Sequence, residues 1–145
     1  MDQSLINAYK AAKYVVELNE VGEKEIRVGK HYQYLDELMA DREAKYAAFI
    51  TPENPHSQKL SKEDNADRHR KFAHLSAVKR LPYLAGYGCD DEELWGREQS
   101  YLTFVKRKEQ ASELASKFEQ NGYLLIEEGA RVKLMIWNGS SYVEA

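Results

Sequence analysis

The side chains best suited to contact a ligand lie in the middle of the chain, where a buried strand is followed by a polar loop and a helix. Arg68 falls near the middle of the side that the helix predicted over 61–81 turns toward the core, and Asn65 falls near the edge of that side. An arginine in such a position needs a partner, because an unpaired charge is costly to bury. Arg68 could pair with a carboxylate such as Asp64, or it could contact an anionic or amide group of a ligand.

Asn54, Glu98 and Ser100 could add polar groups to the same site. Asn54 precedes Pro55, which favours an extended backbone at Asn54. The amide of Asn54 either stabilises a turn or contacts a ligand. Glu98 and Ser100 share one face of the strand predicted from Gln99 onward with apolar residues, so Glu98 suits the rim of the core and a binding site equally.

Three histidines raise the question of a metal site. His56, His69 and His74 lie within nineteen residues. His69 and His74 are five positions apart on the predicted helix, which differs from the i, i+4 spacing that lets two histidines share a metal. We therefore expect no metal ion, and we expect Asn65 and Arg68, rather than the histidines, to face a ligand. The chain has no GxGxxG, P-loop, GxSxG or HExxH motif, so we expect no cofactor.

The composition describes a single domain with a hydrophobic core and excludes several classes of protein. The 145 residues are 43% hydrophobic and 31% charged, with a net charge of -3 and both signs spread along the chain. We expect no broad basic face for a nucleic-acid backbone. No apolar run approaches the ~20 residues that span a bilayer, and the N-terminus lacks a secretory signal, so we expect a cytoplasmic protein without a membrane partner.

Cys89 is the single cysteine of the chain, which excludes a disulfide within it. Because Cys89 lies in a turn-rich segment, a reactive thiol is one alternative, but we favour a small structural residue. The low cysteine content fits the reducing cytosol.

The elements that would position these groups alternate along the chain. Apolar periodicity predicts helices over 4–13, 33–42, 61–81 and 107–119, and strands over 14–18, 25–29, 46–51, 83–87, 99–105, 122–126 and 132–137. Hairpins at both ends exclude a purely parallel sheet. We expect one α+β domain over 1–145, with a mixed, mainly antiparallel sheet flanked by about four helices. We expect a loose tail over 138–145.

The helix over 61–81 is predicted in the most detail. Ser61 opens a capping box with Asp64. Pro82 ends the helix, because it cannot continue the hydrogen-bonding pattern. Phe72 and Val78 are expected on the buried side, together with Leu75 between them.

Four short motifs are similar to those of one protein family. The matching residues are Ile50, Thr51, Asn54 and Pro55 in a strand and loop, Asn65 and Arg68 at a helix start, Glu98 and Ser100 before a strand, and Phe118 and Gln120 near the last helix. Over roughly residues 9–137 the chain resembles the domain-of-unknown-function 3293 family of small bacterial and phage proteins. Pro52 and Glu119 depart from the family pattern, which usually has Ala and often Gly there. The resemblance implies no activity, but it implies polar residues in loops and helix ends, as in a binding pocket.

These observations predict a small-ligand binding domain, for a nucleotide or another phosphorylated or acidic metabolite. The site would lie where the strand over 46–51 meets the helix over 61–81. Arg68 would contact the anion, the amides would contact polar edges of the ligand, and Glu98 would accept from a hydroxyl or amine. The residues expected around the ligand are Asn54, Asn65, Arg68, Glu98, Ser100 and Gln120.

Two alternatives stay open. The chain could be a protein-interaction module, such as a phage-encoded inhibitor of a host protein, with the loop over 52–60 and the region of Trp95 as its contact surface. It could also be an enzyme that uses Glu98 as general base and Arg68 as anion stabiliser. Convergence of Asn54, Arg68 and Glu98 on one cavity would favour a ligand site.

Overall fold

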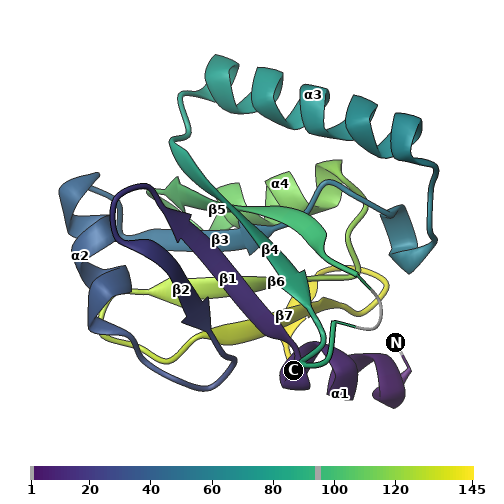
Figure 1. The fold of residues 1–145 in the computed structure, drawn as a ribbon, viewed down its shortest axis with the longest axis horizontal. Coiled ribbons are helices and arrows are strands. Elements are labelled where there is room, and N and C mark those ends of the chain that lie inside the picture. The colour runs from purple at the N-terminus through teal and green to yellow at the C-terminus, as the bar shows by residue number, and fades with distance from the viewer. Residues whose placement is uncertain (1, 94–95) are drawn as a thin grey trace.

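A computed structural model describes residues 2–93 and 96–145, in which one sheet carries helices on both faces (Figure 1). The helices are α1 (Gln3–Ala11), α2 (Gln33–Asp41), α3 (Lys62–Lys79) and α4 (Lys108–Lys117), with a short 3-10 helix η1 (Pro55–Ser57). The strands are β1 (Lys13–Leu18), β2 (Gly22–Ile26), β3 (Tyr46–Ile50), β4 (Tyr83–Cys89), β5 (Glu98–Val105), β6 (Gly122–Glu127), β7 (Lys133–Trp137) and β8 (Tyr142–Glu144). The piece expected around Leu94 and Trp95 lies outside the described residues.

The sheet confirms the predicted α+β class. Its eight strands follow the order β2-β1-β4-β5-β3-β6-β7-β8. All seven pairings between these strands are antiparallel, so the described sheet is antiparallel throughout rather than mainly so. No described helix is long and apolar enough to cross a membrane.

The central strand β3 is covered on both faces, as its unbroken apolar run predicts. Ala47 belongs to a core that also contains Leu35 from α2. Ala48 belongs to the core on the opposite face, which contains Phe72 from α3 and Ala115 from α4. The two adjacent alanines thus separate two hydrophobic layers, and their small side chains leave room for helices on either side.

Helix α3 begins as predicted and ends earlier. The Ser61 hydroxyl accepts a hydrogen bond from the Asp64 backbone N–H at 3.1 Å. The helix ends at Lys79, two residues before its predicted end. Phe72 is fully buried, but Val78 is 66% exposed, so its prediction as a core residue is wrong. Val78 lies about 120° around the helix from Phe72, which turns it away from the sheet.

Two further predictions at the ends of the sheet are wrong. The second strand of the first hairpin covers Gly22–Ile26 rather than 25–29, because Leu18 pairs directly with Gly22. The tail over 138–145 is not loose, since Tyr142–Glu144 form β8 against β7. The ring centroids of Tyr142 and Trp137 are 5.1 Å apart, and this aromatic contact holds the mainly polar tail against β7.

Cys89 closes β4 instead of lying in a loop. The residue is buried, and burial raises the pKa of its thiol above the usual value. A thiol with a raised pKa carries little thiolate at neutral pH, which agrees with a structural role.

Candidate functional site

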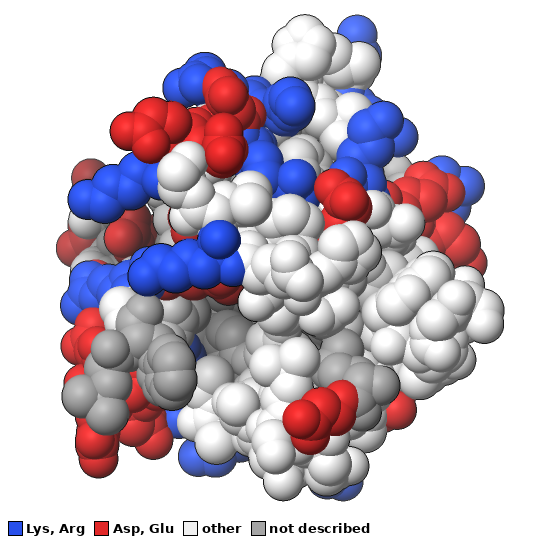
Figure 2. Space-filling view, turned by 90° about the vertical axis from the view of Figure 1, so that its right-hand side faces the viewer, with Lys and Arg blue, Asp and Glu red and all other residues white. Residues whose placement is uncertain are grey.

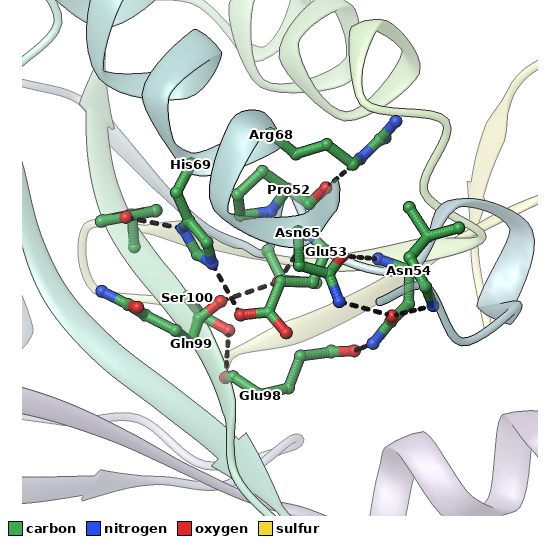
Figure 3. Close-up of polar contacts among 12 residues, drawn as sticks. Pro52, Glu53, Asn54, Asn65, Arg68, His69, Glu98, Gln99 and Ser100 are labelled. Atoms are coloured by element: carbon green, nitrogen blue, oxygen red, sulfur yellow. Dashed lines mark hydrogen bonds and ion pairs between the residues drawn. The ribbon is translucent and has the colours of Figure 1, made fainter. Parts of the chain in front are cut away.

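The loop between β3 and α3 is organised around Asn54. The Asn54 side-chain oxygen accepts hydrogen bonds from the Leu60 N–H at 2.9 Å and from Asn65 Nδ2 at 3.0 Å. The Asn54 N–H donates to Asn65 Oδ1 at 3.1 Å, and Asn54 Nδ2 donates to Glu98 Oε2 at 3.0 Å. The structure therefore brings together three of the predicted site residues, one each from the loop, α3 and β5 (Figure 3).

These bonds also explain why Asn54 is not extended. Its backbone is left-handed, with φ 51° and ψ 67°, although it precedes Pro55. Asparagine tolerates this region better than most residues. The local preference before a proline is overridden by the hydrogen bonds to three distant groups.

Arg68 points away from this group (Figure 3). Its Nε donates to the Pro52 carbonyl oxygen at 2.5 Å, and its guanidinium also donates to the Phe118 carbonyl oxygen. Its carboxylate partner is Glu119, at 3.4 Å, rather than Asp64. Arg68 thus connects the loop, α3 and the end of α4, and its donors are directed at protein acceptors.

Gln120 holds the other side of the loop. The buried side chain donates from Nε2 to the Glu53 carbonyl oxygen at 2.8 Å and to the Phe118 carbonyl oxygen at 3.0 Å. Its own backbone oxygen accepts a hydrogen bond from the Tyr142 hydroxyl at 2.6 Å. The amide oxygen Oε1 accepts no hydrogen bond from any described residue.

A cavity of about 40 Å³ lies beside Glu98, on the face of the sheet that α1 covers. Three of the predicted residues, Glu98, Ser100 and Gln120, contribute to its walls, whereas Asn54, Asn65 and Arg68 do not. The remaining wall residues are Tyr9, Tyr14, Phe49, Thr51, Gly88, Gly122, Tyr123, Leu124 and Leu134. Asn54 acts on the cavity indirectly, because it holds the Glu98 carboxyl group in place.

Three hydroxyl groups of the wall residues donate to protein acceptors. The Ser100 hydroxyl donates to the Glu98 carbonyl oxygen at 3.0 Å, and the Thr51 hydroxyl donates to the Gln99 carbonyl oxygen at 2.7 Å. The Tyr14 hydroxyl donates to the Tyr9 carbonyl oxygen at 2.7 Å. Glu98 Oε1, like the Gln120 amide oxygen, accepts nothing from the described residues. Two of the residues that line the cavity therefore each have a free acceptor.

Burial sets the protonation behaviour of this cavity. It raises the pKa of Glu98, and the nearby Glu53 carboxylate acts in the same direction. The hydrogen bond from Asn54 and the charge of His69 oppose this shift. Burial also raises the pKa of Tyr9, whose hydroxyl lies 3.0 Å from the Ser57 hydroxyl. Glu98 thus keeps its proton to a higher pH than an exposed carboxyl group does.

A neighbouring group was missed in the sequence. His69 Nε2 lies 2.6 Å from Glu53 Oε2, and His69 Nδ1 lies 2.7 Å from the Tyr101 hydroxyl. His69 is not among the residues expected to face a ligand, but it lies four positions after Asn65 on α3, which places both on neighbouring turns of one face. That spacing was the available signal. The described residues contain no group of three or more metal-ligating side chains.

The surface around the loop shows no dominant charge. Figure 2 shows the side of the molecule on which η1 and the start of α3 lie. Blue and red side chains alternate at its top, where α3 lies, and the middle of the face is hollowed and mostly uncharged. The described part of this face offers no broad basic area to a nucleic-acid backbone.

Comparison with known proteins identifies a family without an assigned activity. No curated protein and no solved structure matches the chain significantly. A family model described as "Protein of unknown function (DUF3293)" matches residues 50–122. The match runs from the end of β3 to the start of β6 and contains the six predicted site residues. Because it covers half of the chain, the chain belongs to this family.

Proposed function

We propose that the chain is a small-ligand binding domain, and that the ligand presents an amino group to the cavity beside Glu98. The observation that carries this proposal is that two residues lining the cavity, Glu98 and Gln120, each have an oxygen, Oε1, that accepts no hydrogen bond from the described residues, while the hydroxyls of Thr51 and Ser100 donate to protein carbonyls. A group that only donates hydrogen bonds, such as an ammonium or amide N–H, complements such walls.

The size of the cavity limits what enters it. A volume of about 40 Å³ exceeds the ~10–15 Å³ that a cavity needs to hold one water. The cavity therefore accommodates a head group of water or ammonium size, and the rest of the ligand would lie outside.

Charge favours an ammonium group over a neutral one. Glu98 is half-buried, so its ionised form is less well solvated than that of an exposed carboxyl group, and a cation beside Oε1 would restore part of that loss. Ligand binding and ionisation of Glu98 would then support each other. No lysine or arginine belongs to the described walls of the cavity, so an entering cation meets no repelling neighbour there.

The anionic version of the ligand receives less support. It depended on Arg68, whose donors reach Pro52, Phe118 and Glu119 and which does not contribute to the cavity. A nucleotide or phosphorylated metabolite would need to displace these contacts. The cytoplasmic location expected from the sequence, which would expose the site to amino metabolites, stays a prediction.

Catalysis is a second candidate, because a carboxyl group with a raised pKa suits a general base. Glu98 would accept a proton from the same amino or hydroxyl compound that it binds. Binding of such a compound without its chemical conversion would favour a binding domain over an enzyme.

The proposal is tested by titrating the protein with methylammonium and ethanolammonium at constant ionic strength, followed by backbone amide chemical shifts. We expect saturable shifts at Glu98, Ser100 and Gln120. Tetramethylammonium, a cation without N–H groups, is the matched control and should give none. Equal shifts with this control, or saturable binding of inorganic phosphate at Arg68 in place of the amines, would contradict the proposal.

A further inference from the structure

A second depression lies between α4 and the β7–β8 hairpin. Its walls are formed by Ser112, Glu113, Ser116, Lys117, Trp137, Ser140, Ser141 and Tyr142, and its volume is about 540 Å³. We call it the α4 groove. Tyr142 packs on the core that contains α3 and α4, whereas the Glu98 cavity adjoins the core that contains α1 and α2. The volume of the groove lies within the range of small-molecule sites.

Two aromatic rings form one wall of the groove and are held in place. Trp137 and Tyr142 face each other across β7 and β8, with their ring centroids 5.1 Å apart and an interplanar angle of 61°. Tyr142 also contacts the ring of Tyr123 at 5.1 Å, and its hydroxyl donates to the Gln120 carbonyl oxygen. Because Tyr142 is anchored at both ends, the half-buried indole of Trp137 is a pre-positioned flat surface.

Several polar side chains of the groove have no partner within the described residues, although the Ser112 hydroxyl donates to the Glu109 carbonyl oxygen. Glu113 and Lys117 are four residues apart on α4, a spacing that favours an ion pair. Within the described residues, however, neither forms an ion pair or a side-chain hydrogen bond. The hydroxyls of Ser116, Ser140 and Ser141 likewise have no partner in the described part of the chain. The groove therefore offers a carboxylate acceptor, an ammonium donor and hydroxyls that can do both.

The turn that carries two of these serines has a defined geometry. The backbone N–H groups of Ser140 and Ser141 both donate to Asn138 Oδ1 at 2.9 Å. The Asn138 N–H donates to the Ser141 carbonyl oxygen at 3.0 Å, and Gly139 has a φ of 102° that favours glycine. The serine hydroxyls are thus presented from an ordered turn beside Trp137.

We infer that the α4 groove binds a neutral saccharide chain. A sugar ring has an apolar C–H face that can lie on an indole ring, and a rim of hydroxyls that donate and accept hydrogen bonds. Trp137 supplies the flat surface, and Glu113, Lys117 and the serines supply partners for the rim. One carboxylate and one ammonium balance each other, so the groove selects neither an anion nor a cation. Its open shape admits a chain of sugars rather than one enclosed ring.

The test is a titration of the full chain with four neutral trisaccharides: xylotriose, cellotriose, maltotriose and N,N′,N″-triacetylchitotriose. Chemical shifts of the Ser116, Ser140 and Ser141 amides report on the groove. With each sugar added to a concentration of ~10 mM, the titration detects binding with a Kd of about 1 mM or tighter. We expect a saturable shift with at least one of them.

Variants of the groove decide whether the site is the inferred one. Trp137→Ala should weaken binding about tenfold or more. Trp137→Phe, which keeps a smaller ring and preserves packing on Tyr142, should weaken it less. Glu113→Gln should weaken it about fivefold. Glu109→Gln, one turn away on α4 and outside the groove, is the matched control and should bind as the unaltered chain does.

Two results would overturn the inference. One is the absence of a saturable shift with all four trisaccharides. The other is a shift that Trp137→Phe and Glu113→Gln leave unchanged, which would place the sugar elsewhere on the protein.

Discussion

The Glu98 cavity and the α4 groove are two opposite kinds of depression in one small domain. The cavity measures about 40 Å³, and hydroxyl groups of its wall residues donate to protein acceptors. The groove measures about 540 Å³ and presents unpaired polar side chains of both charges beside an aromatic ring. Under the two proposals, the cavity would receive one chemical group and the groove would bind a larger, uncharged ligand. The difference suggests that volume alone is a poor guide to selectivity, because the smaller depression has the more defined arrangement of hydrogen-bonding groups.

Arg68→Ala should have the largest effect and should separate the two regions. It removes the donor to the Pro52 and Phe118 carbonyl oxygens and leaves both without their partner. We expect the free energy of unfolding to fall by about 2–4 kcal/mol, measured by urea titration. Amine binding at the cavity should weaken as the loop loses its support, while trisaccharide binding in the groove persists.

The matched control for this change is Arg70→Ala on the same helix. Arg70 forms an exposed ion pair with Asp67, and such pairs contribute ~0–1 kcal/mol. If Arg68→Ala lowered the free energy of unfolding no more than Arg70→Ala does, the loop would not depend on Arg68.

Glu98→Gln and Glu113→Gln form a reciprocal pair. Glu98→Gln replaces the free acceptor Oε1 with an amide and removes its charge, so amine binding should weaken by about 10- to 100-fold. Glu113→Gln should leave amine binding unchanged and weaken trisaccharide binding. Isothermal titration calorimetry of both variants with both ligands measures the contrast. A variant that impaired both ligands equally would show that the two depressions are one site or depend on one shared structural change.

The pH dependence should mark the cavity specifically. Burial raises the folded-state pKa of Glu98, and only the ionised carboxyl attracts an ammonium group. Amine affinity should therefore decline as pH falls through this raised pKa, by about tenfold for each further unit. Calorimetric titrations across the acidic range measure the decline, and a flat profile would remove Glu98 from the binding step.

The same shift affects stability with a definite sign. Because the folded pKa of Glu98 is raised, its contribution to stability is fully present below its unfolded value and is lost as pH rises through the folded one. The glutamine of Glu98→Gln does not titrate. As pH rises across this interval, the free energy of unfolding of the variant should therefore increase relative to that of the unaltered chain. Paired urea titrations on either side of the interval provide the check.

Tyr101→Phe should have the smallest effect. It removes the hydroxyl that lies 2.7 Å from His69 Nδ1, while the stacking of ring 101 on Phe72 is kept. We expect a loss of about 1 kcal/mol in the free energy of unfolding. Tyr83→Phe is the matched control, since the Tyr83 hydroxyl has no hydrogen bond within the described residues. A loss equal to that of the control would show that the contact between His69 and Tyr101 adds no stability.

Local patterns predicted the elements better than the site. The cap at Ser61 and the apolar run of β3 act over a few residues, and both are confirmed. Asn54 is left-handed because partners in α3 and β5 outweigh the preference of its neighbour Pro55. No spacing in the sequence could reveal those partners before the strands were ordered.

The walls of the two depressions were hidden for different reasons. Tyr9 and Tyr14 reach the cavity from the start of the chain, far from Glu98 in sequence. Trp137 and Tyr142 are close in sequence, but the polar turn between them suggested a loose tail rather than a strand pair. Gln120 was predicted from the family motifs. The sequence around Glu113 and Lys117 is that of an ordinary exposed helix, so it gave no sign of a groove.

The contacts of Arg68 imply that the loop and the end of α4 open as one unit. The loop amides of Asn54, His56 and Leu60 are bonded to Asn65 Oδ1, Glu119 O and Asn54 Oδ1 respectively. Segments that share such partners exchange their amide hydrogens in common opening events. Deuterium exchange should therefore protect these loop amides to the same degree as the amides that end α4, so that an irregular segment behaves kinetically like part of a helix.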